Sequence, residues 1–473
     1  MNALSQIISY IVSFFLLALP TITFTEGVVG QPRSFFSHQT LTQSDKTISH
    51  LIYRGLFKHD IFGTLVPDLA DNWSISDDGL VYTIKLKEGQ KWSNGDTINS
   101  DDLIYTAFKT LPLQDVATDK VDERTVRYTL PNKFSPFLSL LTDGVTKANA
   151  EEKEDKIIPV TSGKFRVLTV KRSGPIVKEV ILKNNDKKDN IQTLVFRYYG
   201  SNDELGMAAR LGEIDGFLTQ NNLELERFTN YRFPAQSVYY ALLFNLRKDA
   251  VGDLDFRKAL AKVLPLDTMI GTYGIAAQGP ISRSPFTDAQ LKFDYYDKDY
   301  VFDYSTKTVT LTVPDIKSHL ELASRIADVW KDALGVTVNV IKVDPSKIDK
   351  NVIEPRDFEI LFYGQEVGHD PDRYVNWHST QIDAPGLNIT GFKQVRADRA
   401  LEEGRNEIDV NRRFTHYAEF QKSIIENMPV IFLYHPFNNY YVSKNIGGLG
   451  EKYTFGLNDR FLDFSNWKRL ETN

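Results

Sequence analysis

The alternation of apolar and polar residues is regular between residues 80 and 86, where Leu80, Tyr82 and Ile84 begin a series in which every second side chain is apolar. This is the period of a strand buried on one face. The turn sequences DDG and NGD lie on either side of it. Ser100 follows as a predicted helix N-cap, with Asp101 in the first turn, where the helix dipole favours carboxylates. The pattern therefore predicts turn, strand, turn and capped helix in that order.

A second regular pattern covers residues 308–343. Residues 308–313 (TVTLTV) predict a strand, and residues 319–334 predict an amphipathic helix that ends at Gly335. Residues 336–343 alternate again as a strand, and residues 358–363 predict another. Strand, helix and strand in succession form a βαβ unit, so this part of the chain is expected to contain parallel strands.

The other predicted elements follow the same two periods, and together they indicate an α/β protein with mixed sheets. The remaining predicted helices cover residues 44–56, 203–211, 255–264 and 412–426. The remaining predicted strands cover residues 125–130, 163–170, 177–182, 194–199, 239–245 and 430–434.

Length, charge and cysteine content limit the classes of function. At 473 residues the chain is too long for one ordinary core. A net charge of −6 without a long basic run argues against nucleic acid as a partner. The chain has no cysteine, which removes disulfides, thiolate metal sites, cysteine nucleophiles and a lipidated cysteine.

The N-terminus carries an export signal. Residues 7–19 form an uncharged apolar run that ends at Pro20, and its length fits the core of a signal peptide. No Lys or Arg precedes the run and no A-x-A cleavage site follows it. Residues 1–25 are therefore interpreted as a signal peptide. If the apolar run is extended to residue 24, they can also be an uncleaved membrane anchor. A buried helix of the folded protein is the third interpretation. We expect an extracytoplasmic protein, either periplasmic or on the cell surface.

No catalytic constellation is present. The phosphate-binding, dinucleotide-binding, zinc-protease and nucleophile-elbow motifs are all absent from the sequence. The tightest histidine pair is His369 and His378, beside Asp370 and Asp372, and we interpret it as a polar loop because its spacing does not require a metal. We therefore expect no catalytic residue, no metal and no cofactor, and binding is favoured over catalysis.

Residues 68–108 (DLADNWSISDDGLVYTIKLKEGQKWSNGDTINSDDLIYTAF) resemble the signature of the extracellular solute-binding proteins of family 5. These are the dipeptide-, oligopeptide- and nickel-binding components of bacterial ABC importers. Further similar segments are TSGKF at 161–165, RLGEIDG at 210–216, DFRKAL at 255–260, HDPD at 369–372 and MPV at 428–430. The resemblance spans about residues 26–449.

The resemblance implies a two-lobed clamshell of the periplasmic-binding-protein type (type II), with mixed sheets. Lobe I would comprise residues 26–60, 157–245 and 436–473, with an inserted subdomain at 61–156. Lobe II would comprise residues 246–435. The strands that cross between the lobes near Asn245 and His435 would form the hinge, and the ligand would lie between the lobes.

The resemblance also implies where a peptide would bind. In peptide-binding members, an acidic residue before the "DP" sequence binds the ligand amine; here that position is Val367, so Glu366 or Asp370 is expected to replace it. Arg33 would pair with a ligand carboxylate, and Tyr240 is expected to face the other lobe. Tyr363 and Trp377 are expected to form aromatic walls of the cleft, and Phe35 and Asn245 match strand positions of the family. The expected ligand contacts are therefore Arg33, Phe35, Tyr240, Asn245, Tyr363, Glu366, Asp370 and Trp377.

The function that the resemblance implies is capture of a short peptide or similar small solute for delivery to the permease of an ABC transporter. Membrane association would come through the N-terminal segment. Two alternatives stay open: a membrane-anchored sensor or chaperone that uses the same clamshell, and a secreted hydrolase.

Overall fold

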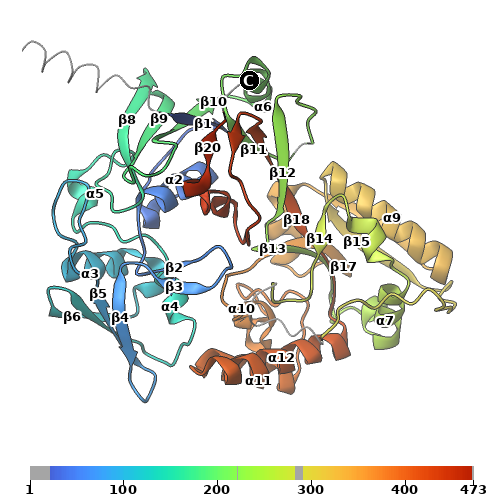
Figure 1. The fold of residues 1–473 in the computed structure, drawn as a ribbon. Helices are drawn as coiled ribbons and strands as arrows, with labels where there is room; N and C mark the ends of the chain where they lie inside the picture. The colour runs from blue at the N-terminus through green and yellow to red at the C-terminus, as the bar shows by residue number, and fades with distance from the viewer. Residues whose placement is uncertain (1–21, 221, 283–290, 471–473) are drawn as a thin grey trace, which may run out of the picture.

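The computed structural model describes residues 22–220, 222–282 and 291–470. The predicted signal peptide or anchor lies almost entirely outside these ranges. In the described part of the chain, one hydrogen-bonded sheet runs through both lobes in the order β16–β15–β17–β13–β18–β11–β1–β10–β9–β8, and β12 and β14 pair with β18. Figure 1 shows the two lobes on either side of the long strand β18 (Val430–Ser443).

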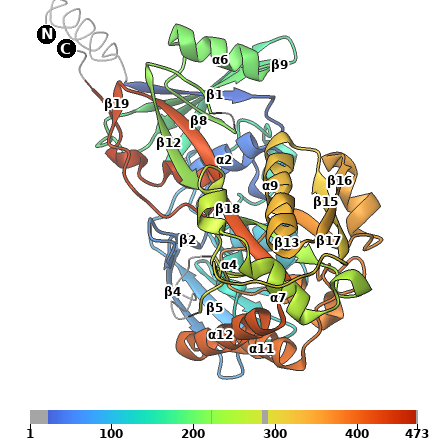
Figure 2. The ribbon, with the colours of Figure 1, turned by 90° about the vertical axis from the view of Figure 1, so that its right-hand side faces the viewer.

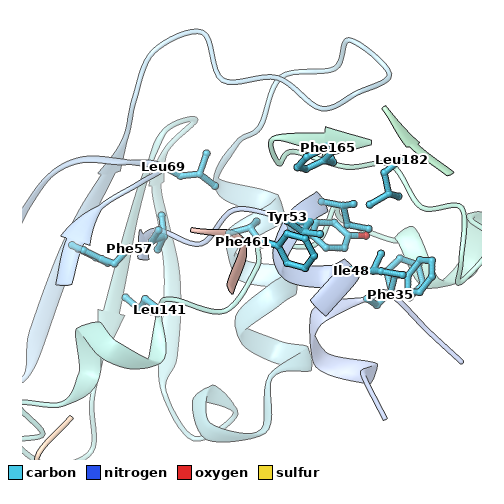
Figure 3. Packing of buried hydrophobic residues seen from close by; sticks show 14 of the residues in the cluster. Phe35, Ile48, Tyr53, Phe57, Leu69, Leu141, Phe165, Leu182 and Phe461 are labelled. Atoms are coloured by element: carbon cyan, nitrogen blue, oxygen red, sulfur yellow. The ribbon is translucent and has the colours of Figure 1, made fainter. Parts of the chain in front are cut away.

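Lobe I is built on a parallel pair, because the first strand runs beside β10 over its whole length. Helix α2 (Gln43–Ile52) buries Ile48 and Ile52 against this sheet, and a capping box between Thr42 and Asp45 fixes its start. Figure 3 shows this packing from close by. The other elements are β1 (Thr23–Val29), β8 (Phe165–Ser173), β9 (Ile176–Asn184), β10 (Thr193–Tyr199), α6 (Asn202–Leu211), β11 (Gly216–Thr219), β12 (Phe228–Pro234), β19 (Ile446–Gly447) and β20 (Lys468–Arg469).

The inserted subdomain lies beside lobe I and shares its hydrophobic core. Its sheet has the order β4–β5–β7–β6. Strand β5 buries Tyr82, Ile84 and Leu86 on one face, so the predicted alternation is confirmed. The elements are β4 (Ala70–Ile75), β5 (Val81–Leu86), α3 (Ser100–Lys109), β6 (Ala117–Asp122), β7 (Thr125–Thr129), α4 (Phe137–Leu140) and α5 (Ala150–Lys153), with the hairpin β2 (Phe57–His59) and β3 (Leu65–Pro67) beside them.

The cap of α3 differs from the prediction by one residue. Asn99, rather than Ser100, is the N-cap: its side chain accepts the backbone N–H of Asp101 and Asp102, and the Asp102 carboxylate accepts the N–H of Asn99 in return. Ser100 is buried and its hydroxyl donates to the carbonyl of Asp122. Either residue type can cap a helix, so the sequence pattern did not distinguish them.

Lobe II contains the predicted βαβ unit. Strand β15 is parallel to both β16 and β17, and α9 connects β15 to β16, so the prediction is confirmed. Helix α9 covers one face of the sheet, while α11 and α12 lie at the base of the molecule (Figure 2). The elements are β13 (Val238–Phe244), α7 (Leu254–Lys262), α8 (Leu266–Ile270), β14 (Gly274–Ala276), β15 (Thr308–Pro314), α9 (Lys317–Leu334), β16 (Thr337–Val343), β17 (Ile360–Glu366), α10 (Tyr374–Trp377), α11 (Val395–Asn406) and α12 (Val410–Asn427).

The chain crosses between the lobes at a different place from the one expected near Asn245. Strand β12 pairs with the lobe I half of β18, whereas β13 pairs with β17 and the lobe II half of β18. The crossing therefore lies at residues 235–237, between these two strands, and Asn245 lies beyond the far end of β13. The second crossing is within β18, around His435 and Pro436, as predicted.

The inserted subdomain also contacts lobe II directly. The backbone N–H of Ser135 donates to the carbonyl of Arg405 (2.8 Å), and its hydroxyl donates to the carbonyl of Gly404 (3.2 Å). The Arg405 guanidinium lies over the ring of Phe134, 5.4 Å from its centroid. The two lobes are thus joined by this contact as well as by the crossing strands.

Candidate functional site

The edge of lobe II beside the crossing strands carries three of the predicted ligand residues, two of them on one face of the sheet and one on the other. This edge consists of the carboxyl ends of the parallel strands β15 and β17, where open α/β sheets bind their ligands. In the antiparallel register of β13 and β17, Val238 lies opposite Glu366 and Tyr240 lies opposite Gly364. Tyr363 is the next residue along β17. Tyr240, Tyr363 and Glu366 therefore lie on neighbouring strands.

An aromatic group surrounds Tyr240. Its ring stacks on Tyr434 (5.1 Å between centroids) and lies 4.8 Å from His319 and 5.9 Å from Phe362. Gly364 leaves room for it, because an added Cβ there would lie 2.8 Å from the Tyr240 ring. Burial raises the pKa of Tyr240, which keeps its hydroxyl protonated at neutral pH. The arrangement offers a rigid, half-buried aromatic surface with a polar tip.

His319 belongs to this group, and sequence reasoning missed it. It is the third residue of α9, and burial lowers its pKa to about 4. Its Nδ1 is buried and has no hydrogen-bond partner among the described residues. The signal was available in the sequence, because the first turn of a helix that follows a parallel strand lies at the ligand-binding edge. A neutral imidazole with a free nitrogen can donate to or accept from a ligand.

Tyr363 and Glu366 both lie at this edge but on opposite faces of the sheet, because side chains alternate along β17. The Tyr363 hydroxyl lies 3.4 Å from Oδ1 of Asp349, and burial, with Asp349 adding to it, raises the pKa of Tyr363 to about 12. The Glu366 side chain is exposed and forms no ion pair with any residue that the structure describes. Glu366 is therefore a carboxylate that is available to a cationic ligand group.

Asp370 is not available in the same way. Its two carboxylate oxygens accept from Nη2 and Nη1 of Arg413, at 2.5 and 2.8 Å. Both side chains are largely buried, so the pair is a structural tie between the loop after β17 and helix α12. Of the two acids considered for the ligand amine, Glu366 is the one that the geometry leaves free.

Three other predicted residues lie in cores, where no ligand can reach them in this structure. Phe35 is fully buried beside Ile48 in lobe I (Figure 3). Asn245 is buried, and its amide donates to the carbonyls of Arg356 and Phe358. Trp377 is buried in the core of lobe II. Aromatic and amide side chains serve equally as cleft walls and as core residues, and the sequence pattern did not separate the two roles.

Arg33 is exposed, but it lies away from the aromatic group. It lines a recess of about 590 Å³ whose walls come from lobe I and the inserted subdomain alone. Its backbone N–H donates to Asp45 at the start of α2 (3.0 Å). The register thus places Tyr240 and Glu366 on one face of the sheet and Tyr363 on the opposite face, with Ala241, and Arg33 lies near none of them.

A larger recess of about 1030 Å³ lies between α2, the β2–β3 hairpin and residues 142–144, and it was not predicted. The exposed face of α2 contributes Lys46 and His50, and Asp143 lies in the opposite wall. Burial raises the pKa of Asp143, against a smaller lowering by His50. This recess belongs to lobe I and to the inserted subdomain, and lobe II does not line it.

Comparison with known proteins identifies the family. A model of the middle region of bacterial extracellular solute-binding proteins, family 5, matches residues 64–384. The chain belongs to this family. The oligopeptide-binding protein AppA of Bacillus subtilis is 22% identical over 479 residues, covering 89% of this chain and 88% of AppA. The periplasmic oligopeptide-binding protein OppA of Salmonella typhimurium is also 22% identical, covering 89% of this chain and 88% of OppA.

Solved structures agree on the fold of this solute-binding protein. The ABC transporter substrate binding protein CtaP of Listeria monocytogenes matches with a TM-score of 0.78 at 21% identity, covering 95% of this chain and 99% of CtaP. AppA of Bacillus subtilis in complex with a nonapeptide matches with a TM-score of 0.66 at 20% identity, covering 95% of this chain and 99% of AppA. The predicted two-lobed clamshell is therefore confirmed.

No three His, Asp or Glu side chains within residues 22–220, 222–282 and 291–470 gather closely enough to hold a metal ion. In the same ranges, none of the helices combines the length and apolar character that crossing a bilayer requires.

Proposed function

We propose that this solute-binding protein captures a short peptide between its lobes outside the cytoplasm and delivers it to the permease of an ABC importer. The observation that carries the proposal is the free carboxylate of Glu366 beside the aromatic group of Tyr240, at the ligand-binding edge of a family 5 fold. Peptides are named as ligands of relatives that cover most of the chain, among them OppA of Salmonella typhimurium. A peptide amine needs a carboxylate partner, and its backbone and side chains need aromatic surface.

The proposal assigns roles to the residues at this edge. Glu366 binds the peptide α-amine, Tyr240 forms the wall, and His319 offers a hydrogen bond to the peptide backbone. We also propose the lobe boundaries in revised form: residues 22–60, 157–237 and 436–470 for lobe I, 61–156 for the inserted subdomain and 238–435 for lobe II.

Native mass spectrometry of the purified protein tests whether peptides co-purify with it, and titration calorimetry with di- to hexapeptides measures the affinity. Glu366→Gln is expected to weaken binding by about 10- to 100-fold, because a hydrogen bond to a charged group is worth about 1.5–3 kcal/mol. Acetylating the peptide amine is expected to weaken binding to the unmodified protein by a similar factor.

Glu354→Gln is the matched control, because Glu354 is an exposed carboxylate of the same lobe that precedes β17. It is expected to leave peptide affinity unchanged. If no peptide gives a heat of binding in calorimetry or a shift in the Tm of the protein, peptide capture is refuted. Equal affinities of the acetylated and free peptides would refute the role of Glu366 alone.

A further inference from the structure

Three rings from distant parts of the chain form one stack. His59 at the end of β2 lies parallel to His369, with centroids 3.7 Å apart and planes 8° apart. His369 stacks on Phe455 from its other side, at 3.6 Å and 27°. The imidazole of His369 is therefore held between a second imidazole and a phenyl ring.

The stack ties lobe II to lobe I. The β2–β3 hairpin is anchored in lobe I, since the neighbouring Phe57 is buried in its core. His369 lies in lobe II, between β17 and α10. The segment of Phe455 is bound on both sides: the N–H of Tyr453 donates to Ile61 in the hairpin (3.0 Å), and the carbonyl of Phe455 accepts from Ser237 at the crossing (2.8 Å).

The carboxylates around the stack are already committed to other partners. Asp60 accepts the backbone N–H of Phe62 and Thr64 in the hairpin turn. Asp370, which adjoins His369, is paired with Arg413. On the C-terminal segment, Asp459 accepts the backbone N–H of Phe455 and Gly456.

Two basic side chains also act on the stack. His50 on α2 and the buried Arg373 of lobe II both lower the pKa of His369. Burial is the largest cause of the shifts: it lowers the pKa of His369 to about 2 and that of His59 to about 4, although Asp60 and Asp370 act to raise the latter. Both imidazoles are therefore neutral at pH 7.

We propose that His59 and His369 are positioning residues that hold the two lobes in this arrangement at neutral pH and release them in acid. They touch no ligand; they act by setting the equilibrium between lobe arrangements. The inference rests on the proposed function in one respect, because the proposed function uses movement of the lobes to capture the ligand.

The direction of the pH effect follows from proton linkage. When the stack separates, the imidazoles enter water and their pKa values return to about 6.5. The separated state then binds more protons than the stacked state at every pH below about 6.5, so acid favours separation. Between pH 7.5 and 5.5 the equilibrium constant for separation is expected to rise by about tenfold for each histidine, as an upper limit.

The experiment measures the distance between the lobes without ligand. The chain has no cysteine, so two cysteines introduced at the exposed positions Lys178 of β9 and Asp332 of α9 allow specific attachment of a fluorescent donor and acceptor. The transfer efficiency of the full-length protein is then followed from pH 7.5 to 4.5. We expect a reversible change in efficiency with a midpoint between pH 5 and 6.5, above both stacked pKa values.

Variants separate titration from packing. His59→Phe and His369→Phe keep a ring in the stack but cannot be protonated, and the double variant is expected to show a flat pH profile at the neutral-pH efficiency. His59→Ala removes the ring and is expected to show the acid-form efficiency already at pH 7.5. His416→Gln is the control, because His416 pairs with Glu403 inside lobe II, and it is expected to keep the unmodified profile.

The proposal is overturned if the double phenylalanine variant retains the pH-dependent change, or if the unmodified protein shows none. Thermal unfolding of each variant shows whether it is folded at 25 °C. If the double variant is unfolded, the single phenylalanine variants decide the question, because each keeps one histidine and is expected to lose about tenfold of the rise in the equilibrium constant. The experiment contains no peptide, so its outcome is independent of whether peptides are the ligand.

Discussion

Gly163 shows how a family motif can serve packing instead of binding. In the TSGKF sequence, the N–H groups of Ser162 and Gly163 both donate to the carbonyl of Ile52, at the end of α2. A Cβ added to Gly163 would lie 2.5 Å from the carbonyl carbon of Ile52 and 2.6 Å from the carbonyl oxygen of Leu51. These are backbone atoms, which cannot move aside as a flexible side chain does. The motif therefore holds α2 in lobe I.

Gly163→Ala is expected to lower the free energy of unfolding by about 1–3 kcal/mol, because the added methyl forces the backbone of α2 to shift. Urea denaturation followed by circular dichroism measures the change. Gly252→Ala is the matched control: Gly252 has φ −67° and its nearest neighbour to an added Cβ is 3.6 Å away. Substitutions at ordinary surface positions change the free energy of unfolding by less than about 0.5 kcal/mol. An equally small change for Gly163→Ala would contradict the packing role.

Asp370→Asn tests the assignment of that acid to structure. The substitution leaves the buried guanidinium of Arg413 without its counter-ion, and we expect a loss of about 3 kcal/mol in unfolding free energy. Peptide affinity, measured by calorimetry where the variant is fully folded, is expected to stay unchanged. Glu321→Gln, in an exposed pair with Lys317, serves as the control with little effect on stability. A variant of normal stability and weakened peptide binding would instead make Asp370 a ligand residue.

At the scale of elements, helix α3 is fixed by one carboxylate with three partners. Asp102 accepts from the backbone N–H of Asn99 (3.1 Å), from the indole of Trp92 (2.9 Å) and from the backbone N–H of Ala148 (2.8 Å). It thus joins the helix cap, the preceding turn and a later loop of the inserted subdomain. Trp92 and Asp102 both lie in the segment that resembles the family signature, and these contacts give them a structural role away from the ligand-binding edge.

Asp102→Ala is expected to lower the free energy of unfolding by about 3 kcal/mol, since the buried indole N–H and two backbone N–H groups lose their acceptor. Differential scanning calorimetry measures the change as a lower Tm. Asp101→Ala removes a neighbouring carboxylate that is exposed and pairs with Lys120, and it is expected to have a small effect. Equal effects of the two substitutions would show that general helix-dipole electrostatics, and not the buried contacts, stabilise α3.

At the scale of the whole molecule, the described part of the chain passes between the lobes in two places, at residues 235–237 and within β18. The hydrophobic cores of the two sides meet at the C-terminal segment of lobe I, where Phe455 is buried in a core cluster of lobe II. Movement of one lobe against the other has to break contacts such as those of Ser135, the stack around His369 and the packing of Phe455 in the core of lobe II. A ligand shifts the balance between arrangements by the contacts it makes in one of them.

A saturating peptide is expected to reduce the radius of gyration, because it stabilises the arrangement in which both lobes contact it. Small-angle X-ray scattering with and without peptide measures the change. The same peptide concentration lies below the dissociation constant of the Glu366→Gln variant. This variant is therefore expected to keep the radius of gyration of the unliganded protein. Binding by calorimetry without any change in scattering would contradict lobe closure.

Local patterns in the sequence determined the βαβ unit and the half-buried strand β5. The period of apolar residues depends on the geometry of a single element, so residues 308–343 were enough to predict strand, helix and strand. Residues 68–108 were enough to indicate the family. The position of the crossing was not determined, because the apolar residues of β13 fit either sheet and only their pairing with β17 assigns them to lobe II.

The ligand site depended on contacts between residues far apart in the chain. The sequence presents Glu366 and Asp370 as equivalent acids, and only the fold brings Arg413 to Asp370 and leaves Glu366 exposed. Likewise, the pairing of His59 with His369 spans more than half of the chain. The sequence by itself thus determined the elements and the family, whose signals are local. Only the tertiary structure decided which polar and aromatic side chains are free for a ligand, because burial and ion pairing depend on neighbours that no local pattern specifies.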